Sequence, residues 1–311
     1  MHEHITRALY YLEVHLLYAS LVWLAAWLLT SIVRGSATTK YWIWVATSLN
    51  FIFPLGAILD KAWASHLSWA SPLGIIGAAA NGISRSPYTP ALCGVWLLGA
   101  TLMLTRLCLR IRSDRRDAPA MSRQSAHEKR RSFLAHGVPV KFGGTRQVPA
   151  VDGVLNPYIS LPQGIDRLLS KHELNAVLIH ELTHARRHDN LIRLIHEVGL
   201  CCLWFHPFVW ITGSRLALYR ELSCDESVIQ RTHGANLVSA LAKLANPEQA
   251  LLLPATASSF ISHRLGRLTA AQPQPGRSVG SALLTVLFGA ALLEGIFGTV
   301  AHTACCFLTK K

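Results

Sequence analysis

Two histidines four residues apart constrain the fold of this chain more than any other feature of its sequence. They bound the run His180-Glu-Leu-Thr-His184. On a helix this spacing places both imidazoles on one face, where they can bind one tetrahedral metal ion at about 2.0–2.1 Å. Glu181, between them, can then act as a general base on water. A solvated, histidine-rich helix has the same spacing, so further ligands are needed to indicate a metal site.

The flanking residues predict that this run is helical. Ser170 and Glu173 have the spacing of a capping box, in which each side chain accepts a hydrogen bond from the backbone N–H of the other residue. A helix therefore begins near Lys171. Apolar residues follow at helical spacing, and we expect the helix to end near Asn190.

A second predicted helix, 215–226, supplies a third ligand. Glu221 and Asp225 lie four residues apart in it and so share a face. We predict that Glu221 binds the same ion as the histidines, and that Asp225 hydrogen-bonds one of the two imidazoles from behind. Three protein ligands leave a fourth position for water, which is typical of catalytic zinc sites.

One ion can bind all three ligands only if they lie on the same side of any membrane. The apolar stretch 199–213 between them therefore does not cross, and we expect a dipping hairpin or an amphipathic element held against the bilayer. Within it, His206 precedes a proline in an aromatic cluster and fits a structural role better than a catalytic one. Tyr219 and Arg220 are both candidates for stabilising an oxyanion, and the sequence does not rank them.

Four runs of residues together resemble the BlaR/MecR-type membrane metallopeptidases. They are the segment 149–162 and the runs Leu-Ser-Lys-His-Glu-Leu, His-Glu-Leu-Thr-His-Ala-Arg-Arg-His-Asp-Asn and Glu-Leu-Ser-Cys-Asp-Glu, all within residues 145–230. The resemblance implies an α-helical membrane protein with an inserted α+β zincin-like (gluzincin) metallopeptidase domain, with Zn²⁺ on the three ligands and Glu181 as the catalytic base. It also implies transmembrane signalling, in which the peptidase cuts a cytosolic protein, either a repressor-type transcriptional regulator or itself.

Other functions stay open beside this one. The best-known members of that family have an extracellular penicillin-binding sensor domain after the last span; because this chain stops at Lys311, we expect that sensing of β-lactams does not carry over. A constitutive membrane-protein processing or quality-control peptidase uses the same ligands. A non-catalytic membrane scaffold can hold a structural zinc, but such a site has no need of Glu181.

Two segments before the histidine helix predict a small sheet. The segments 138–142 and 147–161 are rich in β-branched and turn residues. In zincins similar to this chain, the edge strand before the histidine helix lines the cleft. We expect Val151, Gly153 and Val154 to lie on this edge, where unpaired backbone groups can pair with an extended peptide substrate.

The composition indicates a membrane protein. Hydrophobic residues make up 51% of the 311 residues and charged residues only 15%, with a net charge of +13. A net positive charge of this size is also typical of proteins that bind nucleic acid. In a membrane protein, however, the excess marks cytoplasmic loops and contact with anionic lipid, so we expect membrane lipid as a partner and no direct binding of nucleic acid. The seven cysteines include no C-x-x-C pair, which argues against a disulfide framework and a second metal site.

The apolar segments predict a multi-pass protein of the inner (cytoplasmic) membrane, with a cytosolic catalytic domain and two extracytoplasmic termini. The broken apolar segment 67–83 is expected to be re-entrant or interfacial, because a further crossing would place the basic run 106–131 outside the cytoplasm. The expected spans are 8–33, 41–59, 91–109 and 279–300. The expected domains are an N-terminal membrane domain, a cytosolic metallopeptidase domain, and a last span with a short tail, over residues 1–111, 112–278 and 279–311.

Overall fold

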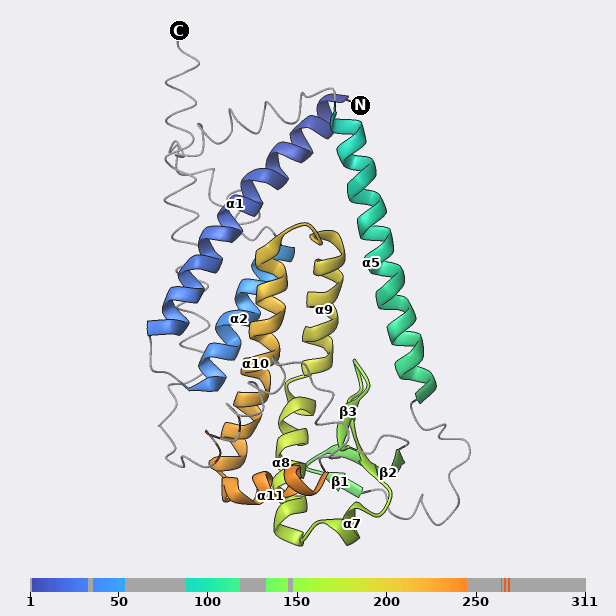
Figure 1. Ribbon diagram of the computed structural model, residues 1–311, viewed down its shortest axis with the longest axis vertical. Coiled ribbons are helices and arrows are strands. Elements are labelled where there is room, and N and C mark those ends of the chain that lie inside the picture. The colour runs from blue at the N-terminus through green and yellow to red at the C-terminus, as the bar shows by residue number, and fades with distance from the viewer. Residues whose placement is uncertain are drawn as a thin grey trace.

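The computed structural model describes residues 2–32, 36–53, 88–117, 133–144 and 148–244, together with the helical residues 264, 266 and 268. Within these ranges the chain is mostly helical, with one small sheet (Figure 1). The expected re-entrant segment 67–83 and the expected fourth span 279–300 lie outside the described residues. The domain boundaries drawn from the sequence stay predictions.

Three helices form the N-terminal part: α1 (His2–Ile32), α2 (Ala37–Ile52) and α5 (Thr89–Asp117). Among the described residues, two helical windows are long and apolar enough to cross a membrane, His15–Ile32 in α1 and Thr89–Ser113 in α5. Only 6% of the α5 window is buried within the structure, so its apolar side chains lie exposed, as they would in a helix that faces lipid. Helix α2, with 16 residues, is shorter than either of these windows. It packs against α1 and α10 (Pro207–Ile229).

A four-stranded sheet follows, with the strand order β1-β2-β4-β3. β2 and β4 run parallel, whereas β1 pairs with β2 and β3 pairs with β4 in the antiparallel sense. The expected strand 147–161 is two strands, because the chain turns at Gly153, where φ is +86° and favours glycine. β1 lies outside the predicted strands, and β3 is at one edge of the sheet. The strands are β1 (Phe133–Ala135), β2 (Val138–Gly144), β3 (Ala150–Asp152) and β4 (Tyr158–Pro162).

After a short helix, α7 (Ile165–Leu168), the chain enters the helix that carries the two histidines, α8 (Lys171–Arg186). The predicted capping box is present. Ser170 N donates to Glu173 Oε2 at 2.7 Å, and Glu173 N donates to Ser170 Oγ at 3.3 Å. Because this start signal involves only residues three apart, it was readable from the sequence.

The end of this helix differs from the prediction. α8 stops at Arg186 instead of continuing to Asn190, and α9 (Asp189–Cys202) begins immediately afterwards. His188, between the two helices, has a φ of 53° in the left-handed region, which ends α8 and redirects the chain. The break places the first residue of α9 beside the histidine face of α8.

α9 and α10 form a helical hairpin that contains the apolar stretch 199–213. Of the two arrangements expected for this stretch, the hairpin is therefore the one present, and Figure 1 shows it between α2 and α5. Tryptophans fasten its turn to α5: Trp96 Nε1 donates to Cys202 O at 2.8 Å, and Trp204 Nε1 donates to Trp96 O at 3.2 Å. The Trp204 ring lies so close to Gly99 that any side chain there would collide with it.

Two apolar cores hold these elements together, and α10 belongs to both. It contributes Leu216 to one core and Val228 to the other, and Glu221 lies between these positions. The first core joins the sheet, α8 and α11 (Gly234–Leu244), through Val140, Ile159, Leu161, Ile165, Leu169, Ala176, Val177, Leu182, Val228, Leu237, Ala240 and Leu268. The second joins α1, α2 and the hairpin, through Leu16, Ala19, Trp23, Tyr41, Trp44, Val45, Phe51, Leu203, Val209 and Leu216.

Candidate metal centre

The structure brings the three predicted ligands together. Nε2 of His184 lies 3.2 Å from Nε2 of His180. The carboxylate oxygens of Glu221 lie 3.5 Å from Nε2 of His180 and 3.7 Å from Nε2 of His184. A tetrahedral ion with bonds of about 2.0–2.1 Å needs donor atoms about 3.3–3.4 Å apart. The three side chains therefore fit one Zn²⁺ ion.

A carboxylate lies behind His180, where the sequence places Asp225. Oδ1 of Asp225 is 3.1 Å from Nδ1 of His180, which is an ion-pair distance without the angle of a good hydrogen bond. Arg264 holds the same carboxylate with two hydrogen bonds, from Nε and Nη2, both at 2.8 Å. Because both oxygens of Asp225 are engaged, its orientation toward the histidine is fixed.

A second carboxylate, absent from the predicted site, lies behind the other histidine. Oδ2 of Asp189 is 2.7 Å from Nδ1 of His184 and accepts a hydrogen bond from Nη2 of Arg187 at 2.6 Å. The break at His188 brings Asp189 into this position. An acidic residue five positions after the second histidine is the signal that could have found it. Each ligand histidine is thus backed by a carboxylate, and each carboxylate by an arginine.

The charges around the ligands favour a cation. Burial lowers the pKa of His180, but its contacts with Asp225 and Glu221 outweigh burial and raise that pKa to about 9. Burial raises the pKa of Glu221, yet its contact with His180 and the neighbouring positive charges keep that pKa well below its usual range. The carboxylate therefore stays ionised, and a bound metal displaces a proton from the imidazole.

The ligands open onto a cleft of about 200 Å³. Glu181 is half-buried and lines this cleft beside the ligands, which is where a general base has to lie. Strand β3 and the first turn of α9 contribute to its walls. The other lining residues are Pro149, Ala150, Val151, Asp189, Asn190, Arg193 and Arg220.

Strand β3 is the edge strand beside this cleft, but the predicted edge is too long. Val151 lies in the strand and lines the cleft, whereas Gly153 begins the following turn and Val154 lies beyond the end of the strand and outside the cleft wall. Nδ2 of Asn190 donates to the carbonyl oxygens of Val151 at 2.9 Å and Gly153 at 3.0 Å. Two acceptors that were expected to be unpaired are therefore already bound to α9.

The structure separates the residues whose roles the sequence left open. Arg220 lines the cleft, and its Nε donates to Oε1 of Glu221 at 3.1 Å. Tyr219 packs against the core of α1, α2 and the hairpin. His206 lies at the turn of the hairpin, with Nε2 3.3 Å from Oγ of Ser20 in α1, which agrees with the structural role expected for it.

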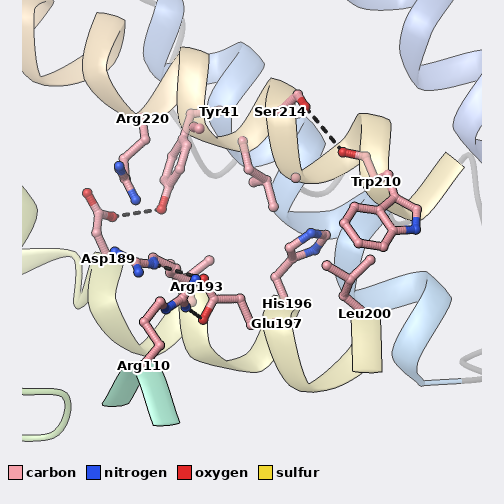
Figure 2. Close-up of a pocket in the computed structure, with 14 residues that line it drawn as sticks. Tyr41, Arg110, Asp189, Arg193, His196, Glu197, Leu200, Trp210, Ser214 and Arg220 are labelled. Atoms are coloured by element: carbon pink, nitrogen blue, oxygen red, sulfur yellow. Dashed lines mark hydrogen bonds and ion pairs between the residues drawn. The ribbon is translucent and has the colours of Figure 1, made fainter. Parts of the chain in front are cut away.

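A larger cavity of about 460 Å³ lies beside the cleft and shares Asp189, Arg193 and Arg220 with it. Figure 2 shows Tyr41 of α2 pointing at Asp189 at one end of this cavity, and Leu200 and Trp210 at the other end. Helix α2 therefore reaches the metal centre from the N-terminal part of the chain.

Two helical histidines with a glutamate from a second helix are the ligand pattern of a metallopeptidase, and among the described residues two helices are long and apolar enough to cross a membrane. The family model of the BlaR1 peptidase M56 matches residues 11–265, which is most of the chain. The chain belongs to this family, and the resemblance predicted from the sequence is confirmed.

Curated relatives agree with this assignment. The chain is 26% identical over 178 residues to the regulatory protein BlaR1 of Bacillus licheniformis, a match that covers 55% of this chain and 29% of that protein. It is 21% identical over 157 residues to the methicillin resistance mecR1 protein of Staphylococcus aureus, covering 48% of this chain and 27% of the relative. The mecR1 protein of Staphylococcus epidermidis matches to the same extent. The chain thus spans less than a third of the length of these relatives.

Proposed function

We propose that this protein is an integral membrane zinc metalloendopeptidase that hydrolyses peptide bonds of a cytosolic protein in transmembrane signalling. The observation that carries the proposal is the convergence of His180, His184 and Glu221 at distances suited to a tetrahedral ion, beside Glu181 in an open cleft. A Zn²⁺ ion held by these three side chains would polarise the scissile carbonyl and make the attacking water more acidic.

The side chains of the cleft have separate roles in the proposed reaction. Glu181 accepts the proton of the attacking water and returns it to the leaving amine. Asp189 and Asp225 keep the two imidazoles turned so that their Nε2 atoms face the ion. Arg220 supplies positive charge to the oxyanion that develops on the carbonyl oxygen. Strand β3, whose Val151 lines the cleft, aligns the extended peptide.

The substrate we propose is a repressor-type transcriptional regulator or the chain itself. The support for this is the family membership and the relatives named as a regulatory protein and a methicillin resistance protein. The apolar windows in α1 and α5 support a place in a membrane, which we propose to be the inner membrane. The arginines at the C-terminal end of α5 support a catalytic domain on the cytosolic side.

Mapping of new protein N-termini in cells tests this proposal. Cells with the wild-type chain and cells with Glu181→Gln are compared, because glutamine keeps the shape of the side chain but cannot accept a proton. We expect a small set of N-termini that appears only with the wild-type chain. Identical sets of N-termini in both strains would point to a scaffold whose metal is structural.

A further inference from the structure

Tyr41, in the predicted membrane helix α2, reaches the metal centre through one carboxylate. Its hydroxyl donates to Oδ1 of Asp189 at 2.7 Å (Figure 2). Oδ2 of the same carboxylate lies 2.7 Å from Nδ1 of His184. Tyr41 is 1% exposed and Asp189 is 4% exposed. The two oxygens of Asp189 therefore join a residue of α2 to a predicted metal ligand of α8.

The same tyrosine ring also covers the cation that neutralises Asp189. The guanidinium carbon of Arg187 lies 4.4 Å from the ring centroid of Tyr41, within the range of a cation–π contact. Arg187 donates to Oδ2 of Asp189 at 2.6 Å. Phenol, guanidinium and carboxylate thus form one buried polar cluster, and in such a cluster the loss of one member leaves another member unsatisfied.

Two further polar contacts hold α2 in register with the catalytic helices. The backbone N–H and the hydroxyl of Thr38 both donate to Oε2 of Glu226 in α10, at 3.0 Å. Oγ of Ser48 lies 2.8 Å from Nδ1 of His196 in α9. Thr38, Tyr41 and Ser48 share one face of α2, so this face is bound to both helices of the hairpin. A slip of α2 by one residue, about 1.5 Å, would take the tyrosine hydroxyl out of reach of Asp189.

We infer that Tyr41 is a positioning residue of the metal centre. It fixes the orientation of Asp189, which in turn holds His184 so that its Nε2 faces the ion. The membrane helix α2 is therefore part of the metal site, in addition to any part it has in anchoring the chain. The inference rests on the metal site of the proposed function, but it concerns how that site is built.

Zinc affinity in detergent, measured by competition with a chromophoric chelator, tests this inference without an activity assay. Tyr41→Phe removes only the hydroxyl and keeps the ring over Arg187. Loss of a group that orients a ligand typically costs 10- to 100-fold in metal affinity. We expect a loss of zinc affinity of about 10- to 100-fold for Asp189→Asn. For Tyr41→Phe we expect a loss of about 10-fold, because Arg187 still holds the carboxylate of Asp189. The absorption spectrum of bound Co²⁺, which reports ligand geometry, should change in both variants.

Ser48→Ala is the matched control, because it removes a polar contact of α2 that does not reach Asp189 and leaves the Thr38 hydrogen bonds that hold the register. It should leave the zinc affinity and the Co²⁺ spectrum as in the wild type. If Tyr41 acts through Asp189, the double variant Tyr41→Phe/Asp189→Asn should bind zinc as Asp189→Asn alone does.

Three results would overturn the inference. The first is a zinc affinity of Tyr41→Phe within twofold of the wild type, with an unchanged Co²⁺ spectrum. The second is an equal loss in Ser48→Ala, which would mean that any weakening of α2 has the same effect. The third is a wild-type chain that binds no zinc, and only that result would also overturn the proposed metal site.

Discussion

Asn190 ties strand β3 to the helix that follows the metal ligands, since its side-chain amide donates to the carbonyl oxygen of Val151 at 2.9 Å. A second bond, to the carbonyl of Gly153 at 3.0 Å, holds the end of the same strand. One side chain at the start of α9 therefore helps to hold the cleft edge, which also pairs with β4 and contacts the histidine helix.

We predict that Asn190→Ala raises KM for a peptide substrate about 5- to 10-fold and leaves the zinc content unchanged. Loss of these hydrogen bonds loosens the edge strand, and a single bond is worth about 1 kcal/mol, or about fivefold. Asn190→Asp has the same shape without the amide donor and should impair KM at least as much. A wild-type KM in Asn190→Asp would contradict this role.

Metal content is the second prediction. The purified wild-type chain should carry about one zinc, as expected for a site with three protein ligands. His180→Ala and Glu221→Ala should each lower the content to about a tenth or less by elemental analysis. His172→Ala changes an exposed histidine of the same helix and should keep the wild-type content. Full zinc in either ligand variant would show that the ion binds elsewhere.

Glu173 makes the stability of the peptidase part depend on pH in the acid range. Contacts with Lys243, Ser239 and the backbone of Ser170 lower the pKa of Glu173 to about 2, below its ordinary value of 4.5. Because the folded pKa is the lower one, the carboxylate stabilises the fold above about pH 4.5, and this stabilisation is lost as the pH falls toward about 2.

Glu173→Gln should therefore lower the thermal unfolding midpoint at pH 7, and the difference from the wild type should shrink between pH 4.5 and pH 3. Thermal unfolding in detergent at a series of pH values measures it. A difference that stays constant over this range would mean that the ionised carboxylate does not stabilise the fold.

Topology gives the fourth prediction, which rests on the basic residues that follow the predicted third span. Arginine is frequent at the C-terminal end of α5 and beyond it, so this end should lie in the cytoplasm. Reporter fusions that end at Ser125 and at Lys310 should report opposite sides of the membrane. Finding both on the same side would remove either the predicted fourth span or the expectation that residues 199–213 do not cross the membrane.

The ligand set was predictable because it depends on local spacing. His180 and His184 share a helix, and Glu221 and Asp225 share another, so the 3.6-residue period places each pair on one face. The capping box at Ser170 is equally local. The only further requirement was that the two helix faces lie against each other. This was expected, because one ion was predicted to bind residues of both helices.

Asp189 and Tyr41 were not predictable in this way. Residues 186–190 are all polar, so the sequence indicates that the helix ends in this stretch but not that the break falls at His188. A non-glycine residue in the left-handed region costs about 1–3 kcal/mol, and here the buried cluster of Asp189, Arg187 and Tyr41 offsets it. Tyr41 comes from a distant helix, and one sequence without an alignment does not indicate which helices dock together.

The rate of peptide hydrolysis by purified Glu181→Gln, measured together with its zinc content, tests the central claim most directly. General base catalysis is worth about 10²–10⁴-fold, so kcat should fall by at least about 100-fold while zinc stays at about one per chain, because Glu181 is not a ligand. His172→Ala should hydrolyse the same peptide at the wild-type rate. A Glu181→Gln variant that keeps its zinc and the wild-type kcat would contradict the peptidase assignment of this site.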